Sequence, residues 1–134
     1  MLPTVNTLLT NEIEITDQPS YTFHLDLEKN DVIGYADGRK AMVQAIYLIL
    51  SIERYRYVTL PWSYGVEFED LYGMPISWVI PESKRRIQEA ILHDVRVFAV
   101  KDFDFEVVEK GKLAIHFTAN TIFGDVDLDW SVNF

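Results

Sequence analysis

Cysteine is absent from this chain of 134 residues. A protein without cysteine has no disulfide framework, no thiolate nucleophile and no cysteine-ligated zinc, so three classes of site are excluded at once. The absence fits a protein that works inside a cell or in a virus particle, where disulfides are rarely the source of stability.

Basic residues are scarce, with 12 Lys and Arg against 21 Asp and Glu and a formal net charge of −9. Nucleic-acid phosphates are bound by clustered Lys and Arg. The one dense basic run, Lys84 to Arg86, is typical of a solvated helix face. The first fifteen residues hold neither a basic n-region nor a long apolar stretch, which argues against a signal peptide or membrane anchor. We therefore expect a soluble protein with no nucleic-acid and no membrane partner.

Repeats, low-complexity tracts and linkers are also missing. The length fits one domain, and an apolar content of 49% is enough for a hydrophobic core. We expect an N-terminal extension over residues 1–20, whose ordering would await an assembly, followed by a single domain over residues 21–134.

The first half of the domain predicts a strand and then a helix. Residues 21–28 alternate apolar and polar side chains, the period of a half-buried strand, and a turn follows at residues 29–31. A helix is predicted from Arg39 to Ile52, after a turn at Asp37 and Gly38. Its apolar residues cover nearly the whole circumference. Either the domain covers all sides of this helix, or a partner protein covers one.

The second half predicts another helix and a sheet. Residues 54–73 read as short extended pieces, and Pro81 is expected in the first turn of a helix that carries Ile87, Ala90 and Ile91 inward. After Asp94 the sequence predicts antiparallel strands over VRVFAV, FDFEVVE, LAIHFTANTIF and DVDLDWSVNF, with a turn at residues 109–112 around Gly111. The predicted fold class is α+β, with two helices packed on an antiparallel sheet that ends in a C-terminal meander.

Carboxylates crowd among aromatic residues in the stretch SIERYRYVTLPWSYGVEFEDLYG, which contains Glu53, Glu67, Glu69 and Asp70. If VEFED is extended, Glu67 and Glu69 share a face with their α-carbons roughly 6.5 to 7 Å apart, close to the carboxyl separation of inverting glycosidases. Acids on one face recur along any polar strand, however. A peptidoglycan glycosidase that uses Glu67 and Glu69, or Glu53, remains the alternative to a structural role.

The sequence contains no complete metal-binding or cofactor-binding motif. Asp125, Asp127 and Asp129 have the spacing that opens a calcium loop, but Trp130 stands where that loop needs glycine. The three histidines are scattered, and the glycines form no phosphate-binding loop. We expect no catalytic residue, no metal and no cofactor.

The C-terminal end is an amphipathic strand that runs to the last residue. Its apolar face is expected to consist of Val126, Leu128, Trp130, Val132 and Phe134. Such a strand either completes the sheet of its own domain or exchanges strands with a neighbouring subunit by β-augmentation.

The order of motifs resembles one known family. DGRKAMVQAIYLILSIERYRY, WSYGVEFEDLYG and PESKRRIQEAILHDVRVFAV are similar to the small baseplate-wedge and sheath-initiator proteins (lysozyme-like wedge proteins) of contractile phage tails and phage-tail-like particles. The likeness covers roughly residues 21–123 and is strongest to the branch from prophages of Gram-positive bacteria. Family members commonly carry Glu-Pro-Arg after the second helix, where this chain has Asp94, Val95 and Arg96.

The resemblance implies a structural and non-enzymatic role. It implies a baseplate component of a virion or tail-like particle, assembled in the host bacterial cytoplasm, with six copies around the tail tube. The implied partners are the tail sheath protein, other wedge proteins, and the tail tube or hub. Asp94 and Arg96 would lie at the wedge junction, Glu53 and Arg54 would mark the helix exit, and the C-terminal strand would seed the sheath through strand exchange.

Overall fold

The computed structural model describes residues 20–134, so the predicted extension, apart from Ser20, lies outside the described residues. The elements in chain order are β1 (Thr22–Asp26), β2 (Asp31–Ala36), α1 (Gly38–Ser51), the 3-10 turn η2 (Glu69–Leu71), α2 (Ile76–Leu92), β3 (Val97–Glu109), β4 (Lys112–Thr121) and β5 (Gly124–Asn133). Neither helix in this part of the chain is both long and apolar enough to cross a membrane.

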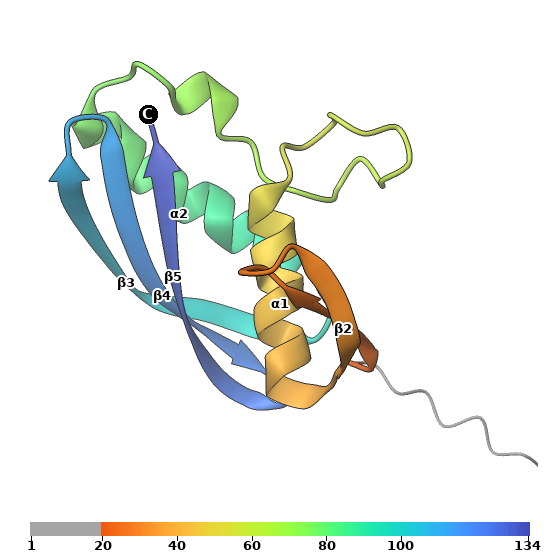
Figure 1. The fold of residues 1–134 in the computed structure, drawn as a ribbon. Helices are drawn as coiled ribbons and strands as arrows, with labels where there is room; N and C mark the ends of the chain where they lie inside the picture. Colours follow the sequence, from red (N-terminus) through yellow and green to blue (C-terminus); the bar gives the residue numbers. More distant parts are fainter. Residues whose placement is uncertain (1–19) are drawn as a thin grey trace, which may run out of the picture.

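The predicted α+β class is confirmed. Strands β3, β4 and β5 form an antiparallel meander in that order, and β1 and β2 form a separate antiparallel hairpin. Helix α2 packs mainly against β3, while α1 packs beside β5 and carries the hairpin on its other side (Figure 1). One core lies between the helices and the meander, with its centre in the alternate buried residues of β4.

Helix α1 agrees with its prediction to within one residue at each end. It begins after Asp37, whose carboxylate accepts a hydrogen bond from the Gly38 N–H at 2.8 Å. The domain buries the sides that carry Ala41, Met42, Ile46, Ile49 and Leu50. Val43 and Tyr47 stay more than a third exposed, so one side of this apolar helix is not fully covered by its own domain.

Helix α2 begins five residues earlier than predicted. Pro75 is its N-cap residue, and its carbonyl accepts hydrogen bonds from Trp78 and Val79, so Pro81 lies inside the helix and not in its first turn. The additional turn is favoured because it buries Val79 and packs Ile76 and Ile80 against the core. The expected inward residues Ile87, Ala90 and Ile91 are all buried.

The β1–β2 hairpin is where the expected burial is wrong. Tyr21, Phe23 and Leu27 were expected on a half-buried face, yet each is more than half exposed. The turn also differs from the prediction, because it covers residues 27–30 and Asp31 already belongs to β2. Period-2 alternation predicts a strand, but only tertiary packing decides whether its apolar face is covered. Here Tyr35 stacks on Tyr21 and Phe23 at the surface.

Residues 52–75 fold as turns and not as the extended pieces that were predicted. Their regular features are a parallel bridge between Glu53 and Val66 and the 3-10 turn η2. Backbone hydrogen bonds of the turn type, such as Leu60 N–H to the Tyr57 carbonyl at 3.2 Å, replace sheet pairing. The aromatic residues that suggested strands are spread around this loop.

The meander differs from the prediction in one strand. The segments VRVFAV and FDFEVVE form a single strand, β3, which is interrupted by register shifts and by the positive φ of Asp102, 57°. The turn at Gly111 and the final strand agree with the prediction.

Candidate partner-binding surfaces

Asp94 and Arg96 form a bidentate ion pair in the turn between α2 and β3. Arg96 donates from Nε to Asp94 Oδ1 at 2.9 Å and from Nη2 to Oδ2 at 2.7 Å, and its backbone N–H donates to Oδ1 at 3.0 Å. The backbone of Asp94 also bonds to Ile91 and Val97 at 3.0 Å each. The turn is therefore held in place although Val95 stands where family members commonly have proline.

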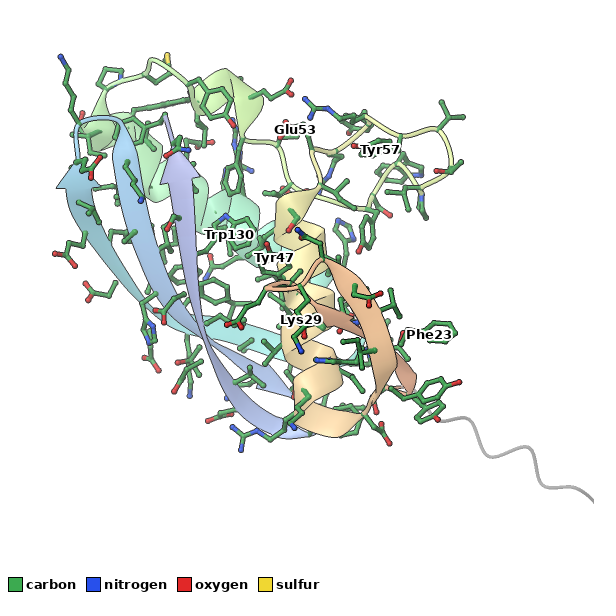
Figure 2. The ribbon with its side chains drawn as sticks, viewed as in Figure 1. Phe23, Lys29, Tyr47, Glu53, Tyr57 and Trp130 are labelled. Atoms are coloured by element: carbon green, nitrogen blue, oxygen red, sulfur yellow. The ribbon has the colours of Figure 1, made fainter. Side chains whose placement is uncertain are left out.

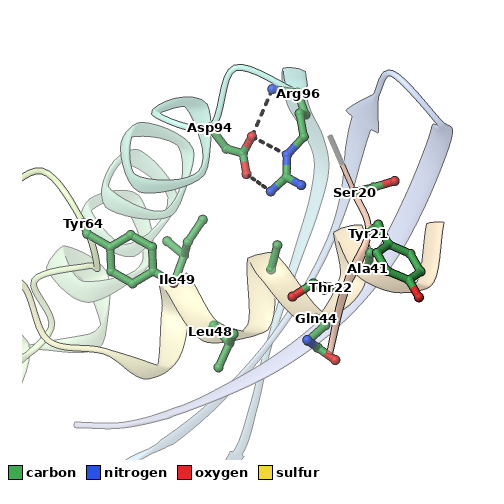
Figure 3. Close-up of a pocket in the computed structure, with 11 residues that line it drawn as sticks. Ser20, Tyr21, Thr22, Ala41, Gln44, Leu48, Ile49, Tyr64, Asp94 and Arg96 are labelled. Atoms are coloured by element: carbon green, nitrogen blue, oxygen red, sulfur yellow. Dashed lines mark hydrogen bonds and ion pairs between the residues drawn. The ribbon is translucent and has the colours of Figure 1, made fainter. Parts of the chain in front are cut away.

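The Asp94–Arg96 pair lines a cavity of about 200 Å³ between β1, α1 and the loop that contains Tyr64 (Figure 3). Leu48 and Ile49 from α1 supply apolar lining. A second cavity of about 150 Å³ shares Ile49, Tyr64 and Asp94 with the first. Both predicted wedge residues thus face concave surface.

The ion pair sets the protonation of both groups. The hydrogen bonds from Arg96 hold the pKa of the Asp94 carboxyl below its usual value, against a smaller opposing effect of burial. Asp94 in turn raises the pKa of Arg96. Asp94 also contributes, after burial, to the raised pKa of Tyr64. The pair is ionised at neutral pH, and its side chains are 13% and 23% exposed.

A double-mutant cycle on Asp94 and Arg96 is expected to give a coupling of about 1 to 2 kcal/mol at neutral pH, because the pair is bidentate and mostly buried. The folded-state pKa of Asp94 is depressed, so this stability is present above the ordinary value of 3.8 and is lost as the pH falls through the lower folded-state pKa. Urea unfolding of Asp94→Asn, Arg96→Gln and the double variant measures the coupling.

An exposed ion pair supplies the control for this cycle. Lys29 lies 4.0 Å from Asp26 with its side chain 71% exposed, so Lys29→Gln should change the free energy of unfolding by less than about 0.5 kcal/mol. A coupling between Asp94 and Arg96 no larger than that control would show that the pair does not stabilise the turn.

Glu53 and Arg54 lie at the exit of α1, as expected, but their side chains bind the chain's own loop. The Glu53 carboxylate accepts hydrogen bonds from the N–H groups of Phe68 and Glu69 at 3.1 to 3.3 Å. Burial raises the pKa of Glu53, although the Phe68 N–H acts in the opposite direction. The Arg54 side chain is 9% exposed and donates to Glu89 at 3.0 Å and to the Gly65 carbonyl. Both residues therefore fasten residues 55–72 to the helices.

The carboxylates that suggested a glycosidase do not share a strand face. Glu69 and Asp70 belong to the 3-10 turn, and Glu67 precedes it in an irregular segment. Glu69 forms an ion pair with Arg56, and Asp70 forms one with Arg86. The extended VEFED geometry on which that hypothesis depended is wrong, because turn hydrogen bonds and these ion pairs fix a different backbone.

The apolar side chains of the C-terminal strand face the domain's own core. Val126, Leu128 and Val132 are buried, and Trp130 and Phe134 pack against the same core. Strand β5 pairs with β4 from Gly124 to Asn133 without a register shift. Of the two arrangements left open by the sequence, completion of the domain's own sheet is the one observed. The second main-chain edge of β5 pairs with no other strand of residues 20–134.

A groove of about 540 Å³ runs beside that edge. It is lined by the end of β5 from Trp130 to Asn133, by Tyr47 and Ser51 of α1, and by Glu53, Glu69 and Tyr72 of the loop. Tyr47 meets Trp130 edge to face, with ring centroids 5.2 Å apart (Figure 2). Local sequence patterns carry no signal for this groove, because its lining comes from three distant segments. Of the lining residues, only Tyr47 could be suspected from the sequence, because it lies one helical turn after the apolar Val43 on the same side of α1.

The acidic residues of β5 form a row on the outer face of the meander. Asp125, Asp127 and Asp129 interact across the strands with Asn120, Thr118 and His116 of β4, in that order. The bond to Asp129 raises the pKa of His116. Nowhere in residues 20–134 are three potential metal ligands gathered. The row is a polar strand face, as the alternation predicted.

Comparison with known proteins identifies the family. The model of the contractile injection system sheath initiator family matches residues 20–124. The phage-like element PBSX protein XkdS of Bacillus subtilis is 30% identical over 110 residues, which cover 73% of this chain and 78% of that protein. The family is one of structural components of contractile tails, associated with the sheath and the baseplate. This chain belongs to the contractile injection system sheath initiator family.

Proposed function

We propose that this protein joins the wedge proteins of a baseplate to the tail sheath and seeds the sheath by β-strand exchange, without enzymatic activity. In this proposal about six copies ring the tail tube, and the particle assembles in the host cytoplasm. The observation that carries the proposal is the regular edge of β5, to which no strand from residues 20–134 is paired. A regular edge presents a row of N–H and C=O groups that can pair with a strand from another chain.

The two edges of the meander differ in a way that favours β5. Strand β5 keeps one register with β4 over its whole length, whereas β3 shows three register shifts against β4. Bulges of this kind twist an edge strand and discourage further pairing. Within residues 20–134, β5 pairs with β4 alone. The sheath side is therefore assigned to the β5 edge.

The wedge side is assigned to the cavity beside Asp94 and Arg96. That cavity is lined by Ala41, Ala45 and Leu48 of α1, whereas the groove beside β5 uses Tyr47 and Ser51. At 3.6 residues per turn these two sets lie on different sides of the helix. One copy could therefore contact a wedge protein and a sheath strand at the same time, with α1 between them.

Electron microscopy of tail particles from cells that lack this gene tests the proposal, with complementation by wild type, Ser131→Pro or Arg96→Ala. Proline at residue 131 removes an N–H that faces away from β4, so the domain keeps its own ladder. We expect sheathed tails with wild type and with the control Ser131→Ala, but bare tubes or baseplates with Ser131→Pro. Arg96→Ala should reduce incorporation of the protein into baseplates.

Truncation after Gly124 would not serve this purpose, because it removes Val126, Leu128 and Val132 from the core. Circular dichroism must first establish that Ser131→Pro is folded. Normal sheathed tails in the null strain, or with a folded Ser131→Pro, would contradict the proposed role of the β5 edge.

A further inference from the structure

We propose that the strand which adds to β5 alternates apolar and basic residues, with its basic residues beside Asp127 and Asp129. This inference rests on the proposed function, because it assumes that the β5 edge accepts a strand. It adds a partner of defined chemistry, which can be sought in the sequence of any candidate. Three features of the edge lead to it: the direction of its main-chain groups, the apolar surface on one side and the charge on the other.

The main-chain groups of the edge follow from the antiparallel ladder. Phe134 donates its N–H to the Gly111 carbonyl at 2.7 Å, so Phe134 and every second residue before it are turned toward β4. The N–H and C=O groups of Asp127, Asp129, Ser131 and Asn133 therefore point to the free edge. The start of the edge is already used, because Arg39 donates to the Asp125 carbonyl. An added strand has room along residues 127–133.

One face of such a strand would lie over apolar side chains. Its residues on the core side would continue the row of Leu128, Trp130 and Val132. Val43 and Tyr47 of α1 lie on that side, and each is more than a third exposed. The groove that contains Tyr72 lies there too. Apolar side chains at alternate positions would cover this surface and remove it from water.

The other face would lie beside negative charge. Asp127 and Asp129 point to the outer face, and the Asp129 side chain is 88% exposed. Their neighbours on β4 are Thr118 and His116, and the acids Asp104 and Glu106 of β3 occupy the same outer face two strands away. Across residues 20–134, His116 is the one basic group that forms an ion pair with this row. Opposite charges on directly neighbouring strands stabilise pairing, and like charges oppose it.

Fluorescence anisotropy with the purified full-length chain tests the inference. Three labelled nine-residue peptides share valine at every second position and carry Lys, Thr or Glu at the others. Two cross-strand charge pairs should make the Lys peptide bind on the order of 10-fold tighter than the Thr peptide. The Glu peptide should bind weakest.

Variants of the protein locate the effect. Asp127→Asn with Asp129→Asn should bring the affinities for the Lys and Thr peptides to within about 2-fold of each other. Asp104→Asn with Glu106→Gln changes the net charge equally but lies two strands from the edge, so it should keep most of the preference. Ser131→Pro should abolish binding of both peptides.

The outcomes separate this inference from the proposed function. Equal binding of the Lys and Thr peptides, lost in Ser131→Pro, would overturn the basic alternation and leave the strand-accepting edge standing. Lys-peptide binding that survives Ser131→Pro would overturn it as well, since the attraction would not need the edge. Failure of all three peptides to bind would contradict the edge itself.

Discussion

Replacing Phe117 by alanine is expected to lower the free energy of unfolding by about 3 to 5 kcal/mol. Phe117 lies in the middle of the central strand β4, is fully buried, and stacks on Phe103 with centroids 5.5 Å apart. Its removal leaves a cavity that the sheet and both helices cannot easily close, because neighbouring side chains already fill the core. Urea unfolding at equilibrium measures the loss.

A second phenylalanine of the meander is the control for this change. Phe98 in β3 is 68% exposed, so Phe98→Ala should cost less than about 1 kcal/mol. If the two variants were destabilised equally, the core would not be centred on β4. Since β5 pairs with β4 across Phe117, loss of this side chain should also weaken the edge that is proposed to receive the sheath.

Replacing Gly65 by alanine is expected to destabilise the protein by about 3 to 4 kcal/mol. Gly65 has φ +95°, and a β-carbon there would come within 2.5 Å of the Ile52 carbonyl oxygen. That carbonyl accepts the Val66 N–H at 3.0 Å, and Val66 in turn accepts the Arg54 N–H at 3.2 Å. The clash would push apart the bridge that closes the 53–66 loop. Urea unfolding again supplies the measurement.

The variant Gly73→Ala is the control that distinguishes the steric clash at Gly65 from the cost of a positive φ alone. Gly73 has φ +78° but no atom within 4 Å of an added β-carbon, so Gly73→Ala should cost about 1 to 2 kcal/mol. Equal losses at Gly65 and Gly73 would mean that the contact with Ile52 is relieved by relaxation. Because Gly65 follows Tyr64, which lines the cavity proposed for the wedge contact, the Gly65 variant should also lower incorporation into baseplates.

Local pattern was enough for the elements whose burial is decided locally. The broad apolarity of residues 39–52 and the strict alternation of β5 gave correct elements, since a helix or strand with those faces has few other ways to pack. The start of α2 and the exposure of β1 could not be predicted. The start of α2 depends on the burial of Val79 in the core. The exposure of β1 arises because no segment of the described chain outside the β1–β2 hairpin covers its exposed apolar side chains.

The candidate sites divide in the same way. Asp94 and Arg96 are two residues apart, so one turn is enough to bring them together, and it was the family resemblance that singled them out. The groove beside β5 needs Tyr47, Tyr72 and Trp130 from three segments. Local sequence patterns do not predict that these three segments come together. The turn geometry of VEFED was hidden for a related reason, because its partners Arg56 and Arg86 come from outside the motif.

The unequal edges of the meander have a consequence for stoichiometry. A sheet that grows from copy to copy needs two receptive edges on each unit, one to give and one to take. This meander offers a regular edge at β5 alone, and the irregular β3 does not match it. Copies of the protein would then add one foreign strand each without extending into a fibre of their own. Under the proposed function, the number of copies around the tail tube would set the number of starting points for the sheath.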